Sequence, residues 1–275
     1  MWVIKELIDS ICYPTYVLLG RRPWTLGYYT AKKWAIQNAI DNKLFCGNSA
    51  LPVGYGLRID ERVIEYPWVY SRLADKPGAV LDAGSALNYK FLLERAPIQN
   101  SNLTICTLAP EKRCYSNKKI SYTFDDLRDN RFRDAVFDVV ISISTIEHIG
   151  LDNTLLYTHD TSKHENDRLS FLSAIREFRR VLKPGGICFI SVPYGKAKNH
   201  GWFQVFDALM VQSILDAFRP SQTELEYFGY SQFGWAKVDA SSLENATCFD
   251  IHAQKHYDSD FAAFSRGVVC MQMVS

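Results

Sequence analysis

The feature that most constrains the fold is an alternation of apolar, strand-like segments with amphipathic segments, which begins near residue 78. Segment 169–182 carries apolar side chains at helical spacing before Lys183-Pro184-Gly185-Gly186, and 206–218 is a second amphipathic helix. Alternating strands and helices predict a mostly parallel, doubly wound sheet that is covered on both faces. Ligands bind such sheets at the carboxyl ends of the strands, near the point where strand order reverses. Seven strands are predicted: 79–83, 103–107, 120–124, 137–144, 186–193, 225–231 and 267–274.

The N-terminal region lacks this alternation and is rich in aromatic residues. Its segment 30–47 predicts a helix that has Thr30 as a candidate N-cap and Gly47 as its stop. We therefore expect two parts, an N-terminal helical cap over 1–75 and an α/β domain over 76–275.

Composition limits the classes of partner. The 275 residues carry a formal net charge of +1 without a long run of Lys or Arg, which argues against duplex nucleic acid as the main partner but leaves room for a local basic patch. The seven cysteines are an odd number, and Cys106, Cys188 and Cys270 lie inside apolar runs. This pattern indicates a reduced, cytoplasmic protein.

The first 24 residues include an apolar run that requires a separate check. Charged residues interrupt it early, and Pro14 lies within the run from Ile11 to Leu19, which is too short to span a bilayer. Three interpretations stay open. The segment lies on a membrane surface, packs on the domain as a helix, or forms a homodimer contact.

Three segments together resemble a known family. They are "VLDAGSALN" (80–88), "FDVVISISTIEHIG" (137–150) and "EFRRVLKPGGICFISVP" (177–193). In this order and spacing they resemble the first, fourth and fifth strand motifs of class I S-adenosylmethionine-dependent methyltransferases. The resemblance covers 76–194 well and implies a Rossmann-like methyltransferase fold that has S-adenosylmethionine as its cofactor. The run from Glu61 to Asn88 also resembles methyltransferase-like proteins of bacterial surface-polysaccharide gene clusters.

The resemblance implies a donor site after the first strand. Gly84 would let the backbone approach a ligand, and Asp82 would bind the ligand's amino group or the loop itself. An ordinary strand-to-helix turn that binds nothing is the alternative. One glycine of the three in G-x-G-x-x-G argues against a nicotinamide site. The implied cofactor-binding residues are Asp82, Gly84, Ser85, Ala86, Asn88, Thr107, Leu108, Asp126, Leu127 and Ser144.

The second strand departs from the family pattern. The resemblance puts Thr107 where the family usually has an acid that holds both ribose hydroxyls. Either the affinity for the donor is reduced, or another group such as Glu65 compensates. After the third strand, Asp126 and Leu127 match the positions that contact the adenine. Asp125 is an equal alternative on register, and a helix N-cap pair is the interpretation without a ligand.

Glu147 and His148 follow the fourth strand and are the candidate catalytic residues. A similar pair helps to hold a divalent metal in ubiquinone-pathway O-methyltransferases. Here Ser144 replaces that family's third ligand, so we predict no metal and favour His148 as a general base that takes a proton from the acceptor hydroxyl. Ordering of the loop by the pair is the alternative.

Polar clusters occur in three further loops. The segment 157–168 lies where acceptors bind in this architecture, 248–256 has a His-x-x-x-His spacing, and 193–202 has basic residues that could face an anionic acceptor. Ordinary solvated surface is the alternative for each. The residues concerned are His159, Asp160, His164, Glu165 and Asp167; Cys248, Asp250, His252 and His256; and Tyr194, Lys196, Lys198 and His200.

The resemblance thus implies methyl transfer to a hydroxyl of a small molecule, a sugar, a nucleotide-sugar or another glycan precursor in polysaccharide biosynthesis. Two alternatives remain: a non-catalytic partner or regulatory protein that keeps the fold, and an enzyme that uses another nucleoside or nucleotide.

Overall fold

The computed structural model describes residues 2–47, 50–154, 160–250 and 252–275. The chain forms two compact units. The first combines residues 1–72 with 227–268, and the second combines 73–226 with 269–275. The break after residue 72 lies close to the division at residue 75 that the sequence suggested. Segment 227–268, which the sequence analysis placed in the α/β domain, groups with the N-terminal helices.

The first unit is held together by contacts between its two chain segments. Trp24 Nε1 donates to the carbonyl oxygen of Ala263 at 2.8 Å, and Trp235 Nε1 donates to that of Ile59 at 2.9 Å. Buried indole N–H groups need such acceptors, so these bonds tie distant parts of the sequence. Its elements are α1 (Trp2–Leu18), α2 (Tyr28–Asp41), α3 (Arg62–Arg72), β9 (Gly234–Val238) and η5 (Ala240–Leu243).

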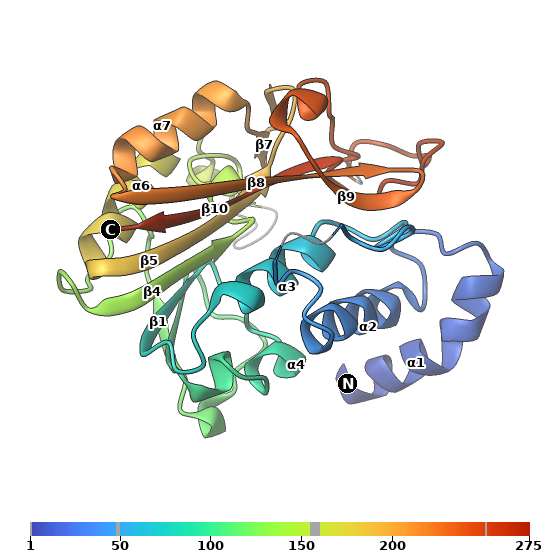
Figure 1. The fold of residues 1–275 in the computed structure, drawn as a ribbon, viewed down its shortest axis with the longest axis horizontal. Coiled ribbons are helices and arrows are strands. Elements are labelled where there is room, and N and C mark those ends of the chain that lie inside the picture. Colours follow the sequence, from blue (N-terminus) through green and yellow to red (C-terminus); the bar gives the residue numbers. More distant parts are fainter. Residues whose placement is uncertain (1, 48–49, 155–159, 251) are drawn as a thin grey trace. The chain divides into compact units, whose positions relative to one another are not determined.

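The second unit is built on the sheet. Figure 1 shows α6 and α7 on one face of the sheet and α4 on the other. The elements are β1 (Ala79–Ala83), α4 (Lys90–Leu93), η1 (Ile98–Asn100), β2 (Asn102–Thr107), η2 (Ser116–Lys118), β3 (Ser121–Phe124), β4 (Phe137–Ile143), η3 (Ile146–His148), η4 (Thr161–Lys163), α6 (Phe171–Val181), β5 (Leu182–Pro193), β6 (Lys198–Asn199), β7 (Gln204–Val205), α7 (Ala208–Phe218), β8 (Gln222–Ser231) and β10 (Gly267–Val274), of which β8 and β10 continue into the first unit.

The strands of the main sheet pair in the order β3-β2-β1-β4-β5-β10-β8-β9. β1 is parallel to β2 and β4, β2 to β3, and β4 to β5. β8 and β10 are antiparallel, because Ser221 N donates to Val274 O while Tyr230 N donates to Arg266 O. Chain order reverses between β1 and β4, so the carboxyl ends of these two strands form the switch point at which a ligand is expected.

The structure confirms the predicted fold class, a large and mostly parallel sheet with flanking helices and helices at the N-terminus. Several details differ from the sequence prediction, and the helix predicted over 30–47 ends at Asp41 rather than at Gly47. The main sheet has an eighth strand, β9, which forms an antiparallel hairpin with β8. Helix α2 begins at Tyr28 rather than after Thr30, because its N-cap is Gly27, whose φ of 90° favours glycine.

Among the residues that the structure describes, no helix combines the length and the apolar character that crossing a bilayer requires.

Candidate functional site

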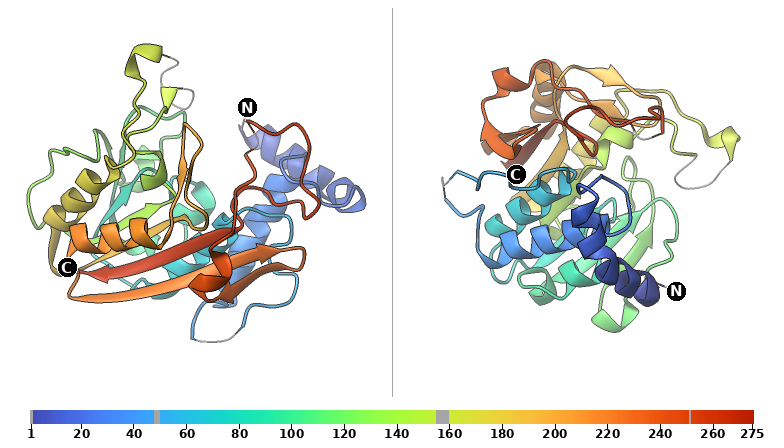
Figure 2. Two further views of the ribbon diagram at one scale, coloured as in Figure 1. Left: turned by 90° about the horizontal axis from the view of Figure 1, so that it is seen from above. Right: turned by 90° about the vertical axis from the view of Figure 1, so that its right-hand side faces the viewer.

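A cavity of about 390 Å³ lies at the carboxyl ends of β1 to β4. Its walls come from the loops that follow these four strands and from the segment around η4, which stands out from the rest of the second unit (Figure 2). Small-molecule sites typically measure roughly 300–1,000 Å³, so the cavity suits a ligand of that class. It is lined by Gly84, Thr107, Leu108, Ala109, Asp126, Leu127, Arg128, Thr145, His148, Ile149, Gly150, Leu151, Asn153, Thr154, Ser162, Lys163, His164 and Glu165.

Gly84 is required by the backbone at the end of β1. Its φ is 113°, a region that L-residues rarely adopt, and its N–H donates to Cys106 O at 2.9 Å. A Cβ at this position would overlap the side chain of Thr145 and lie 2.7 Å from the Cβ of Thr145. The glycine therefore lets the loops after β1 and β4 meet, and it exposes bare backbone to the cavity.

Asp82 holds the loop after β1 in place. Its carboxylate accepts hydrogen bonds from Ala86 N at 3.1 Å and Leu87 N at 2.8 Å. Burial raises the pKa of Asp82 to about 7, although these two amides oppose the shift. Of the two roles expected for Asp82, the structure shows the contacts of the second, binding of the loop.

The other predicted residues of this loop point to contacts outside the cavity. Asn88 Nδ2 donates to Glu111 Oε2 at 2.9 Å, and Asn88 Oδ1 accepts from the Tyr122 hydroxyl at 3.1 Å. Ser85 is buried and has a φ of 62°. Asp82, Ser85, Ala86 and Asn88 do not line the cavity, so they support the shape of the loop that presents Gly84.

The ends of β2 and β3 bring a hydroxyl, a leucine and an acid to the cavity. Thr107 is buried at the end of β2, and the next residue, Leu108, is 52% exposed. Asp126 lines the cavity, whereas Asp125 accepts from the backbone amides of Asp126 and Arg131. The two acids that the sequence left equal therefore have different surroundings, and Asp126 is the one at the site.

Arg128 joins Asp126 to the segment around η4. Its Nη2 lies 2.7 Å from Asp126 Oδ2, and its Nη1 lies 2.7 Å from Glu165 Oε2. Partial burial opposes ionisation of Asp126, but the hydrogen bonds and charge of Arg128 hold the pKa of this carboxyl below its usual range. His164 Nδ1 lies 3.1 Å from Asp152 Oδ2 and adds a second contact at this rim.

His148 lies in η3, which directly follows the turn after β4. Its Nδ1 is 2.8 Å from the carbonyl oxygen of Trp202, and its ring stacks on that indole with 5.3 Å between centroids. A carbonyl can only accept, so Nδ1 carries the proton and the neutral ring keeps its lone pair on Nε2. Glu147 is buried, with Oε1 3.9 Å from His148 Nε2, and it does not line the cavity.

Ser144 does not lie at the cavity wall. Ser144 is buried with a φ of 38°, and its N–H donates to Ser191 O at 3.0 Å. Thr145 lines the cavity instead.

Glu65, the suggested substitute for the ribose acid, is fully buried in the first unit, where its Oε2 lies 2.5 Å from Arg62 Nη1.

The loop clusters that the sequence singled out are distributed unequally. In the segment 157–168, His164 and Glu165 line the cavity, Asp160 caps η4 through Ser162 N, and His159 lies outside the described residues. In 248–256, Asp250 Oδ1 accepts from His252 N. Among the described residues, no group of three or more His, Cys, Asp or Glu side chains is arranged to hold a metal ion.

Comparison with known proteins identifies the central part of the chain. Residues 83–190, from the end of β1 to most of β5, match the family model described as a methyltransferase domain. Residues 83–190 are therefore similar to a methyltransferase domain. The domain indicates S-adenosylmethionine as the cofactor, which confirms the prediction from the sequence.

Three solved structures are similar to the chain. The 1,6-didemethyltoxoflavin-N1-methyltransferase of Burkholderia thailandensis, with bound 1,6-didemethyltoxoflavin and S-adenosylhomocysteine, is 13% identical at a TM-score of 0.42, over 72% of this chain and 70% of that chain. N-methyltransferase NodS of Bradyrhizobium japonicum WM9, in complex with S-adenosylhomocysteine, is 13% identical at a TM-score of 0.39, over 72% of this chain and 78% of that chain. An S-adenosylmethionine-dependent methyltransferase of Methanosarcina mazei is 14% identical at a TM-score of 0.43, over 76% of this chain and 97% of that chain.

The lining of the cavity fits the cofactor that the methyltransferase domain implies. Gly84 offers backbone without a side chain, Thr107 offers a hydroxyl, and Asp126 offers a carboxylate that can accept from an amine. Leu108 and Leu127 supply apolar surface for a ring system. The fit is incomplete at one point, because a threonine hydroxyl replaces the carboxylate expected for the ribose diol.

Sequence reasoning missed several residues of the methyltransferase domain that line the cavity. Thr145 was passed over for Ser144, and nothing marked Arg128 or Asn153. Asn153 Nδ2 donates to the carbonyl oxygens of His148 and Leu151, so it orders the turn that carries His148. The Asp-Asn pair at 152–153 was a usable signal, because the side chains of both residue types commonly bind nearby backbone groups in turns.

Proposed function

We propose that the protein is an S-adenosylmethionine-dependent methyltransferase that methylates a hydroxyl of a small molecule, either a sugar or another glycan precursor. The single observation that carries the proposal is the tautomer of His148. Its Nδ1 is fixed by the Trp202 carbonyl, so Nε2 is the basic nitrogen of a ring that lines the cavity.

His148 would act as the general base in this reaction. The bound cofactor supplies an electrophilic methyl group on its sulfonium. Nε2 of His148 would accept the proton that the acceptor hydroxyl loses. The carboxylate of Glu147, 3.9 Å away, favours the imidazolium that results. Holding the acceptor in line with the methyl group is the other main contribution of the site.

The polar rim supports a hydroxyl-rich acceptor. Asn153, Ser162, Lys163 and His164 line the cavity together with Arg128. Side chains of this kind both donate to and accept from hydroxyl groups, as a sugar requires. The expected place of the protein in polysaccharide biosynthesis rests on the sequence resemblance and remains a proposal.

Calorimetry and turnover test this function in two steps. Titration with S-adenosylmethionine, S-adenosylhomocysteine and NAD should give binding of the first two and none of NAD. Release of S-adenosylhomocysteine should then be measured with a panel of monosaccharides, nucleotide-sugars and simple phenols. Turnover of phenols alone, or binding of NAD in place of S-adenosylhomocysteine, would contradict the proposal.

One observation favours a second candidate, a non-catalytic partner or regulatory protein with the same fold. Thr107 cannot make the two charge-assisted bonds that a carboxylate makes to a diol. Donor binding that is absent in calorimetry, from a protein that is folded by circular dichroism, would support this candidate over the enzyme.

A further inference from the structure

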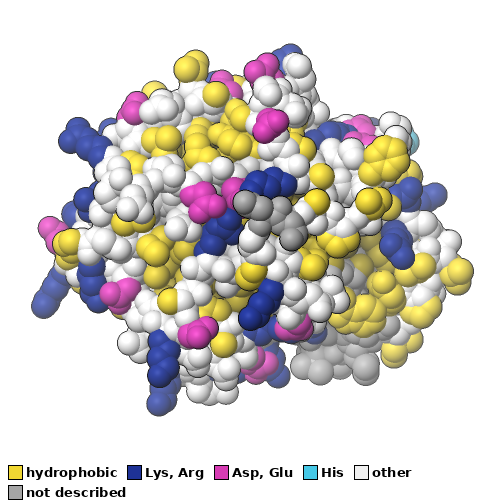
Figure 3. Space-filling model, in the orientation of Figure 1, with side chains coloured by type: hydrophobic (Ala, Val, Ile, Leu, Met, Phe, Trp, Pro, Cys, Tyr) yellow, Lys and Arg dark blue, Asp and Glu magenta, His cyan; other side chains and the backbone are white. Residues whose placement is uncertain are grey.

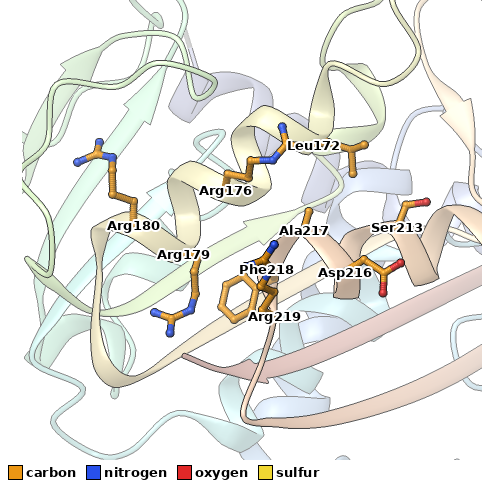
Figure 4. Close-up of a pocket in the computed structure, with 9 residues that line it drawn as sticks. All are labelled: Leu172, Arg176, Arg179, Arg180, Ser213, Asp216, Ala217, Phe218 and Arg219. Atoms are coloured by element: carbon orange, nitrogen blue, oxygen red, sulfur yellow. The ribbon is translucent and has the colours of Figure 1, made fainter.

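A groove of about 690 Å³ lies between α6 and α7, apart from the candidate site (Figure 4). Its residues come mostly from the C-terminal halves of the two helices. α6 ends at Val181, directly before β5 begins at Leu182. The groove therefore lies toward the starting end of β5, whereas the cavity lies at the carboxyl ends of β1 to β4. The two concave surfaces are separate.

One end of the groove is strongly basic. Arg179 and Arg219 lie at this end, and Arg176 lines the groove nearer to Leu172 (Figure 4). Among the described residues, no carboxylate lies within 4.0 Å of the charged nitrogens of these three arginines. Arg180 differs, because its guanidinium binds Glu177 and Asp134 at 2.6 Å each, and Figure 4 shows it directed away from the other three. Asp216 is the acid in the lining. Elsewhere, on the face drawn in Figure 3, basic and acidic side chains are interspersed.

The other end of the groove is apolar. Figure 4 shows Leu172 and Ser213 at the end opposite Arg179 and Arg219. Leu209 precedes Ser213 by one helical turn in α7, and Leu169 O accepts from Leu172 N at 3.0 Å in the turn before α6, so both leucines lie near this end. Leu169 is 59% exposed and Leu209 is 79% exposed. Exposed leucines beside a concave surface are typical of an interaction site.

The arginines have a local role that does not account for the whole surface. Cations in the last turn of a helix interact favourably with the helix dipole, and Arg179 and Arg180 lie in the last turn of α6. That role requires neither the groove nor the two exposed leucines. It also leaves the unneutralised charge of three guanidinium groups along the groove.

We propose that the groove between α6 and α7 binds an acidic peptide segment of a partner protein, with carboxylates on Arg176, Arg179 and Arg219 and an apolar anchor on Leu169, Leu172 and Leu209. Guanidinium groups pair with carboxylates through two parallel hydrogen bonds. The apolar end favours a peptide over a nucleic acid, whose backbone has no aliphatic side chains. The concave shape favours a peptide over a lipid surface.

A random 12-residue peptide library is the probe. The intact protein and its Arg176→Gln/Arg179→Gln/Arg219→Gln variant should each be used for selection. The control variant, Lys112→Gln/Arg131→Gln/Arg133→Gln, loses three exposed cations outside the groove. Both variants therefore change the formal net charge by the same amount, from +1 to −2. Circular dichroism melting should show that all three proteins are folded.

The expected result is enrichment of peptides that combine Asp or Glu with Leu, Ile or Phe. Affinity for an enriched peptide, measured by fluorescence anisotropy, should fall at least tenfold in the groove variant and by less than twofold in the control. Serine in place of the peptide's apolar residues should also weaken binding. Equal losses in both variants, or enriched peptides without acids, would overturn the proposal. Tighter binding of phosphatidylglycerol vesicles or of single-stranded RNA through the same arginines would overturn it too.

Discussion

At the scale of single residues, His148 is the proposed general base. Glutamine in its place keeps much of the side-chain volume but cannot accept a proton near neutral pH. His148→Gln should therefore lower turnover by roughly a hundredfold or more and leave donor affinity within about twofold. Initial rates and calorimetry with S-adenosylhomocysteine measure the two effects.

His200→Gln is a matched control for this variant. His200 and Phe203 lie between β6 and β7, and their rings stack with 4.2 Å between centroids. His200 does not line the cavity. Its turnover should stay near that of the parent. If His148→Gln instead loses melting temperature and donor affinity together, His148 orders the loop and does not take the proton.

Thr107 is the residue that we propose lies at the ribose of the cofactor. A carboxylate at the end of β2 could accept from both hydroxyls, and charge-assisted hydrogen bonds are about twice as strong as neutral ones. Thr107→Asp should tighten S-adenosylhomocysteine binding by about fivefold, equivalent to about 1 kcal/mol. Thr107→Asn supplies the same shape without the charge and should gain less. Weaker binding by the aspartate variant than by the asparagine variant would remove Thr107 from the ribose site.

Predictions for single residues succeeded where the residue type alone sets the backbone. Gly84 was found from the sequence because a glycine after a strand lets the backbone approach a ligand, and in the structure its φ is 113°. The roles of Asp125 and Asp126 could not be separated, because one residue of register changes which acid faces the cavity. Arg128 was missed because its partner Glu165 is 37 residues away in the chain.

At the scale of elements, the loop after β1 depends on the protonation of Asp82. Burial raises the pKa of Asp82 from 3.8 to about 7, so the folded state binds a proton more tightly than the unfolded state. The stability that this proton contributes is fully present below pH 3.8 and is lost as the pH rises through about 7. The loop is therefore least stable when the buried carboxylate is charged.

Asp82→Asn tests this dependence. The free energy of unfolding of the parent, relative to that of the variant, should fall between pH 4.5 and 7.5 by an amount on the order of a few kcal/mol. Urea unfolding of both proteins at several pH values gives the difference, from which all other titrating groups cancel. Parallel curves would show that Asp82 titrates alike in the folded and unfolded states.

Elements with strong periodicity were predictable from the sequence. β1 and β10 have the predicted bounds, and α6 lies within the predicted 169–182. The hairpin partner β9 was missed because Gly234 to Val238 is short and half exposed, so it lacks the apolar run that marked the other strands. The same reason hides β6 and β7, which have two residues each.

At the scale of the whole molecule, the mostly parallel sheet followed from the sequence pattern, but the grouping of the chain did not. Segment 227–268 belongs with residues 1–72 through bonds such as that of Trp235 to Ile59, which are 176 residues apart. Local patterns carry no information about such distant pairs. The position of the donor site is a further property of the whole chain, because four separate loops must come together to form it.

Hydrogen exchange measured by mass spectrometry tests that assembly. S-adenosylhomocysteine at about 100 times its Kd should slow exchange that requires ligand release by about a hundredfold. We expect the slowing in peptides that cover 82–88, 107–109, 126–128 and 145–151, because these loops form the cavity or hold it in shape. Peptides over α7 serve as the reference and should exchange as before, since α7 does not line the cavity. Protection of α7 without protection of the four loops would place the donor in the arginine-lined groove, and the candidate site would then be wrong.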